Sequence, residues 1–413
     1  MTVIATWYKL AAMLEKTDHR SLLILALCQA LAMTCSALVI TTTAIVGRMV
    51  APDPGLATLP LALQFLGLMA STRPAAAAMR RWGRRAGFSA GAMAGVLAGG
   101  VATAGVIHQS FVAFCIGAVL TGVFLAHAMH YRFAAADTAP PAVQSRAISL
   151  VMAGGVLAAV AGPQLAAWSK DLFAPIAFAG VYTVLSGLCA FQLILLQTAS
   201  LPGPGSRAAA DGPRDERASS GFWNLPRRFL PAALCGMVGY GSMNLVMAVT
   251  PPAMSDCGYG FETAAFVIQW HILAMFAPAF ATGHIIERLG LQNVLLGGIG
   301  LMLGAVAFNA TGLTLANFSF GLVLLGIGWN FMFVGATTWL TRIQSTQNTA
   351  RLQGLNDIMV FGAVAVTALS SGWLFDTLGW LAVNLAIVPG LLVTFAVVVA
   401  APPRPVGAVA AAE

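Results

Sequence analysis

Long apolar runs alternate with short polar breaks along the whole chain. Each run has about the 20 residues that an α-helix needs to cross a bilayer. The twelve runs lie at residues 22–47, 57–78, 88–107, 111–131, 149–168, 175–196, 229–250, 264–282, 292–310, 317–340, 353–374 and 379–400. The pattern predicts an all-α integral membrane protein with twelve transmembrane helices.

One polar break is much longer than the others. Residues 198–228 are rich in Pro, Gly, Ser and charged side chains, which is typical of a linker. The break separates six predicted helices from six. We therefore expect three parts: an N-terminal half at 1–197, a cytoplasmic linker at 198–228 and a C-terminal half at 229–413.

The composition agrees with the hydrophobic pattern. Of the 413 residues, 59% are hydrophobic and only 8% are charged, whereas soluble domains carry about 25% charged residues. The chain has too few charges to cover a surface that faces water, so its main partner is the lipid bilayer. No basic and aromatic patch typical of nucleic-acid binding accompanies the net charge of +7, so we expect no nucleic-acid partner.

The Lys and Arg residues indicate the orientation. If the N-terminus is cytoplasmic, only Arg48 and Lys170 lie on the outer side of the predicted helices. Cytoplasmic loops carry an excess of Lys and Arg, so the bias predicts that both termini and the linker are cytoplasmic. We expect a multi-pass monomer of the bacterial inner membrane.

Two loops about two hundred residues apart resemble each other. Arg81-Trp82-Gly83 follows the second predicted helix, and Arg288-Leu289-Gly290 follows the eighth. Tandem six-helix halves are a known plan of membrane transporters, with the cargo site near the middle of the bilayer between the halves. The repeat therefore favours transport.

The loops resemble the Gly-x-x-x-Asp-Arg-x-Gly-Arg-Arg motif of the major facilitator superfamily. The second half keeps Gly283, Glu287, Arg288 and Gly290. The first half keeps Arg81, Gly83, Arg84 and Arg85, with Arg80 in place of the acid and Ala76 in place of the glycine. The stretch GGVLAAVAGPQLA at 154–166 resembles the fifth helix of the same superfamily. The resemblance implies its fold and transport by alternating access.

Two predicted helices carry side chains that can bind a soft metal ion. Met243 and Met247 are four residues apart, and so are His271 and Met275, so each pair shares one face of its helix. The helices are consecutive and antiparallel, and the two pairs occupy overlapping depths. Thioethers select Cu(I), and imidazole also suits copper.

The same residues have a plainer interpretation. The chain contains 17 Met, and Met is a common filler of apolar cores, so either Met pair can be ordinary packing. An ionisable residue inside a membrane span is by default a functional candidate, which makes His271 the informative member.

The combination resembles the CcoA-type copper importers of the superfamily. The resemblance implies that Met243, Met247, His271 and Met275 are metal ligands and that Cys235 and Cys257 are accessory thiols. It also implies import of copper, as Cu(I), for assembly of a cbb3-type cytochrome c oxidase, with a cytoplasmic copper chaperone as a partner. Copper is then the cargo, and no cofactor is expected.

A second pair, His127 and His130, lies near the inner end of a predicted helix. It is either an accessory exit-side site or an interfacial pair reached by water. Two other functions remain open: transport of an organic solute such as riboflavin, and a non-transporting membrane assembly factor. We expect no enzyme, because the sequence has no set of nucleophile, base and acid and no phosphate-binding loop.

Overall fold

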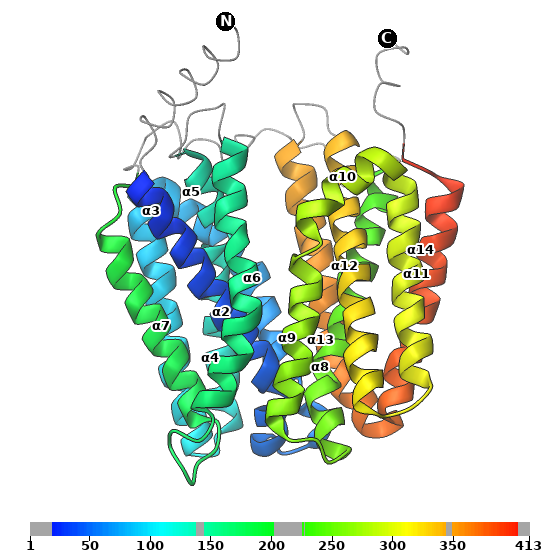
Figure 1. The fold of residues 1–413 in the computed structure, drawn as a ribbon. Helices are drawn as coiled ribbons and strands as arrows, with labels where there is room; N and C mark the ends of the chain where they lie inside the picture. Colours follow the sequence, from blue (N-terminus) through cyan, green and yellow to red (C-terminus); the bar gives the residue numbers. More distant parts are fainter. Residues whose placement is uncertain (1–18, 138–143, 202–224, 227, 344–348, 404–413) are drawn as a thin grey trace, which may run out of the picture. The chain divides into compact units, whose positions relative to one another are not determined.

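The chain is all-helical in a computed structural model that describes residues 19–137, 144–201, 225–226, 228–343 and 349–403 (Figure 1). The all-α prediction is confirmed. The helices of the N-terminal part are α2 (His19–Val50), η1 (Pro54–Leu56), α3 (Leu59–Ile107), α4 (Phe111–Ala128), α5 (Tyr131–Asp137), α6 (Gln144–Ser169) and α7 (Ala179–Gln197). The C-terminal part holds α8 (Phe229–Asp256), α9 (Phe261–Phe276), α10 (Ala279–Leu289), α11 (Leu291–Ala310), α12 (Leu315–Ile343), α13 (Thr349–Ala386) and α14 (Val388–Ala400).

The chain forms two compact units. The first contains α2 as far as Val39 and the chain from Gly67 to the linker, and the second contains Ile40–Leu66 and the chain after the linker. The end of α2, η1 and the start of α3 thus pack with helices of the C-terminal part. Most of the predicted linker lies outside the described residues, and the boundaries at 197 and 229 stay predictions.

The apolar runs fall on the observed helices. Within the described ranges, nine helices are long and apolar enough to cross a membrane, and the bent pair of α9 and α10 makes a tenth candidate. Two of the nine extend over 54 and 49 residues, so each covers two of the predicted runs.

The predicted end of the helix that begins at 229 was wrong. The run at 229–250 stops before Pro251 and Pro252, yet α8 continues to Asp256 with both prolines inside it. Proline removes a backbone donor. The prolines leave the carbonyls of Met247 and Ala248, four residues earlier, without their usual helical donors, and the Cys257 N–H donates to the Ala253 carbonyl at 3.2 Å where the helix ends.

The repeated loops share an unusual backbone conformation. Gly83 has φ 85° and ψ 162°, and Gly290 has φ 84° and ψ 149°. This region is open essentially to glycine alone, so the Arg-x-Gly pattern marks a sharp bend in both units. The sequence repeat therefore reflects a repeat of local structure.

Close backbone contacts organise the second unit. A Cβ added to Gly328 of α12 would lie 2.9 Å from the Gly298 carbonyl of α11, and one added to Gly298 would lie 3.0 Å from the Gly328 carbonyl. Small residues let membrane helices approach closely, which favours van der Waals packing where no water is present. α12 consequently packs against α8, α9 and α11 (Figure 1).

Candidate functional site

All four predicted metal ligands lie in the second unit and are buried. Met243 and Met247 are on α8, and His271 and Met275 are on α9. Their side chains are at most 6% exposed.

His271 faces α12. Its Nδ1–H donates to the Leu322 carbonyl at 2.7 Å, which fixes the neutral tautomer and leaves Nε2 as an acceptor. Nε2 is buried and has no hydrogen-bond partner among the described residues. Metal-bound histidines commonly donate their other N–H to a carbonyl in this way. The ring therefore both ties α9 to α12 and presents a free basic nitrogen.

Both Met and His pairs lie on helices that pack against α12. A Cβ on Gly326 of α12 would lie 2.8 Å from the His271 carbonyl and 3.2 Å from the Met275 amide nitrogen. On α8, Gly239 lies one turn before Met243 and packs against Met332 of α12. The two pairs therefore have one neighbouring helix in common, and their role as ligands stays a prediction.

A metal site in the described part of the chain would depend on thioethers. No three His, Cys, Asp or Glu side chains come together there as metal ligands do. The two thiols predicted to assist have different surroundings. Cys235 is fully buried in an apolar cluster with Leu295 and Trp339, whereas Cys257 is an exposed free thiol just after α8.

The second histidine pair lies in the first unit. His127 is buried near the end of α4 and hydrogen bonds through Nδ1 to the Val123 carbonyl one turn earlier, at 2.9 Å. A Cβ on Gly91 of α3 would overlap the Cβ of His127. His130 follows in the turn before α5, with its ring 5.9 Å from that of Phe133. Close packing on α3 accounts for His127, and an exit-side role for the pair stays a prediction.

Five aromatic rings form a cluster in the second unit that the sequence did not predict. Trp329 and Phe333 of α12 are stacked, with centroids 5.1 Å apart and an interplanar angle of 8°. Tyr240 of α8 meets Trp329 and Phe333 edge-on at 5.4 and 5.5 Å, and Phe361 of α13 at 6.1 Å. Phe276 of α9 lies 6.0 Å from Trp329. The four-residue spacing of Trp329 and Phe333 is the sequence pattern that could have indicated the stacked pair.

The helix beside this cluster is broken. The run at 264–282 predicts one continuous helix, but α9 ends at Phe276 and α10 begins at Ala279 with a bend of 44°. Pro278 has no N–H to donate, so the preceding turn loses a hydrogen bond. Asn330 of α12 donates to the Met275 carbonyl at 2.7 Å and accepts from the Thr282 hydroxyl at 2.6 Å. One amide thus stabilises both sides of the break.

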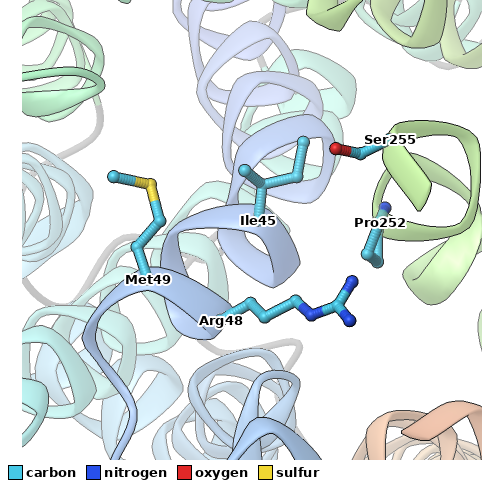
Figure 2. Close-up of a pocket in the computed structure, with 5 residues that line it drawn as sticks. All are labelled: Ile45, Arg48, Met49, Pro252 and Ser255. Atoms are coloured by element: carbon cyan, nitrogen blue, oxygen red, sulfur yellow. The ribbon is translucent and has the colours of Figure 1, made fainter. Parts of the chain in front are cut away.

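A shallow cleft lies elsewhere in the same unit, at the end of α2. Figure 2 shows Arg48 reaching from α2 toward Pro252 and Ser255 of α8, with Ile45 and Met49 on the α2 side. Arg48 forms an ion pair with Asp256 at 2.7 Å. The cleft measures about 180 Å³, which is smaller than the roughly 300 Å³ of a typical small-molecule site.

The known proteins that resemble this chain in sequence include membrane transporters. A family profile described as Major Facilitator Superfamily matches residues 22–356. The riboflavin transporter RfnT of Brucella anthropi is 36% identical over 373 residues, which cover 90% of this chain and 93% of that protein. The uncharacterized MFS-type transporter YdeG of Bacillus subtilis is 28% identical and covers 84% of this chain and 83% of its own length.

Solved structures agree on the fold. The crystal structure of a D-xylose–proton symporter matches with a TM-score of 0.69 at 14% identity, covering 93% of this chain and 98% of that one. A bacterial homolog of the human lysosomal transporter Spinster matches with a TM-score of 0.66 at 15% identity, covering 91% and 95%. At these identities the likeness concerns the fold alone.

Proposed function

The chain belongs to the Major Facilitator Superfamily and is a membrane transporter rather than an enzyme, and we propose that its cargo is a flavin such as riboflavin. The similarity to the riboflavin transporter RfnT carries this proposal. It extends over 90% of this chain, so it includes helices of both halves. Among the functions left open by the sequence, the organic-solute transporter therefore has the best support.

The proposal includes the direction and the location of transport. The excess of Lys and Arg on one side favours cytoplasmic termini in a bacterial inner membrane. Alternating access, in which the two halves rock around a central site, is the mechanism of such tandem transporters. We propose uptake of the flavin into the cytoplasm by this mechanism.

Copper import is the second candidate, and one observation favours it. His271 holds a buried Nε2 without a partner in the described residues, in the tautomer that metal ligation requires. Met243, Met247 and Met275 are buried on the same pair of helices. The comparisons give this candidate no support beyond the superfamily, so it stands behind the flavin.

An uptake assay separates the two candidates. The protein is expressed in bacteria that cannot make riboflavin and lack their own flavin transporter, and growth at low riboflavin is measured together with uptake of labelled riboflavin. We expect growth and uptake with the parent chain. Uptake no greater than in cells with an empty vector would overturn the flavin proposal.

Copper accumulation is measured in the same cells at equal membrane levels of each variant. His271→Asn keeps an N–H that can donate to the Leu322 carbonyl but removes the Nε2 acceptor. Met247→Leu conserves volume and apolarity, so folding changes little, and Met302→Leu in the core of α11 is the matched control. If copper is the cargo, His271→Asn and Met247→Leu lose accumulation and Met302→Leu keeps it. Equal copper content in all of them excludes this candidate.

A further inference from the structure

The aromatic cluster lies near the middle of α8 and α12 and at the break between α9 and α10. Trp329 is the fifteenth of the 29 residues of α12, and Tyr240 is the twelfth of the 28 residues of α8. Phe276 is the last residue of α9, at the break before α10. Cargo sites of tandem transporters lie near the bilayer midplane and are often formed by discontinuous helices. The cluster lies near the middle of two long apolar helices and beside a broken one.

The rings are not sealed inside the core. Tyr240, Phe276 and Phe333 are partly exposed, whereas Trp329 and Phe361 are 5% and 9% exposed. The stacked pair of Trp329 and Phe333 therefore has a buried member and a member that a planar ligand can reach. Offset stacking on such a pair suits a flat ring system and tolerates little else of that size.

Two buried polar atoms beside the rings have no partner within the described residues. They are the indole Nε1 of Trp329, a donor, and the Oδ1 of Asn244, an acceptor. Asn244 lies one turn after Tyr240 on α8, and its Nδ2 donates to the Val364 carbonyl of α13 at 3.3 Å, one turn after Phe361. An unmade buried hydrogen bond is costly, so these atoms mark where a ligand can supply partners.

We propose that Tyr240, Phe276, Trp329, Phe333 and Phe361 form the subsite that receives the planar ring system of the cargo. This inference rests on the proposed flavin transport. The isoalloxazine system of a flavin is flat and carries carbonyl oxygens and a ring N–H along one edge. The ring system stacks on the accessible Phe333, a carbonyl at its edge accepts from Trp329 Nε1–H, and the ring N–H donates to Asn244 Oδ1.

Flavin fluorescence provides a direct test, because an indole close to the isoalloxazine rings quenches it. Purified protein in lipid nanodiscs is titrated against riboflavin and against lumichrome, which retains the ring system and lacks the ribityl chain. We expect both to bind with quenched fluorescence and ribitol not to compete. Binding of lumichrome is the readout that assigns recognition to the rings.

Variants of Trp329 and Phe333 separate the contribution of stacking to binding from that of hydrogen bonding. Trp329→Leu should weaken binding at least about tenfold, or about 1.4 kcal/mol, and Phe333→Leu should also weaken it. Trp329→Phe keeps a ring and loses the N–H, so it should fall between the parent and Trp329→Leu. The matched controls are Phe308→Leu and Phe320→Leu, which alter an exposed aromatic pair of the same unit, 6.0 Å apart, and should leave binding unchanged.

The outcomes separate this inference from the transport proposal. If riboflavin binds the parent and Trp329→Phe and Phe333→Leu bind it within twofold of the parent, the cluster is packing and flavin transport stands. If the parent binds neither riboflavin nor lumichrome, both are overturned. Size-exclusion profiles equal to that of the parent establish that each variant is folded, and Trp329→Phe keeps the test decisive should Trp329→Leu fail to fold.

Discussion

Arg48 at the end of α2 connects two other helices of the second unit. Its Nη1 lies 2.7 Å from Asp256 Oδ1 at the end of α8, and its guanidinium carbon lies 6.0 Å from the centre of the Phe375 ring on α13. α2 belongs by sequence to the first half and α8 and α13 to the second. Alternating access moves the helices of one half against those of the other, so we expect these contacts to break once in each cycle.

Each contact contributes only a small stabilising free energy, as expected for contacts that must break during transport. The Arg48 and Asp256 side chains are 38% and 48% exposed, and exposed ion pairs contribute about 0.2–1 kcal/mol. An exposed cation–π contact adds about 0.5–1 kcal/mol. Their sum of roughly 0.7–2 kcal/mol corresponds to about a 3- to 30-fold shift between the closed and opened arrangements.

The shift can be measured by the access of a reagent to a buried position. Thr58 follows η1, is fully buried, and accepts a hydrogen bond from the Gly372 N–H of α13 at 3.0 Å. A Thr58→Cys reporter in a Cys257→Ser background is labelled with a large polar maleimide in nanodiscs. Adding Arg48→Gln should raise the labelling rate about 3- to 30-fold.

Two controls define the result. Lys170→Gln removes an ion pair of the first unit, between Lys170 and Asp171 at 3.5 Å, and should leave labelling unchanged. About 1 M salt screens exposed charges and should raise labelling of the Arg48 protein more than that of Arg48→Gln. Equal labelling rates for Arg48 and Arg48→Gln, at low and at high salt, would refute the reasoning.

Three further predictions concern the second unit. Partial burial and then the charge of Asp256 raise the pKa of the Cys257 thiol, so its maleimide labelling should be slow at pH 8, rise with pH, and be faster at pH 8 in Asp256→Asn. Asn330→Ala leaves a carbonyl unsatisfied at the α9–α10 break and should cost about 1–3 kcal/mol, measured by denaturant unfolding in detergent. Gly290→Ala should cost about 1–3 kcal/mol by thermal unfolding because its φ is 84°, whereas Gly297→Ala, in open space within α11, should cost nothing.

The lengths of the apolar runs were sufficient to predict the helices but not the residues at which they end. In lipid, the backbone N–H and C=O groups of a membrane span must hydrogen bond to each other. Apolar runs of this length are therefore expected to be helical. The ends do not follow from the positions of the prolines alone. α8 passes through Pro251 and Pro252, whereas the helix breaks at Pro278, where Asn330 donates to the Met275 carbonyl. That amide comes from another helix, and no local pattern could predict it.

The candidate site, too, could be predicted only in part from the sequence. His271 stood out in the sequence because ionisable side chains are rare in membrane spans, and the structure gives it a packing role toward Leu322 as well as a free Nε2. The aromatic cluster could not be predicted, because Tyr240, Trp329 and Phe361 come from three helices. Each of these residues alone is unremarkable in a membrane helix, and only the tertiary packing brings their rings within 6.1 Å.

Along α12, the contact of His271 and the stacked aromatic rings lie at different levels. The His271 ring meets α12 at Leu322, and the stacked rings begin at Trp329, seven residues later. At 1.5 Å per residue, these levels are about 10 Å apart, which exceeds the reach of one side chain. A substitution at Trp329 therefore leaves the His271 ring in place, and His271→Asn leaves the aromatic rings in place. Loss of flavin binding in the Trp329 variant and loss of copper uptake in His271→Asn would then be independent results, each assigned to the residue that was changed.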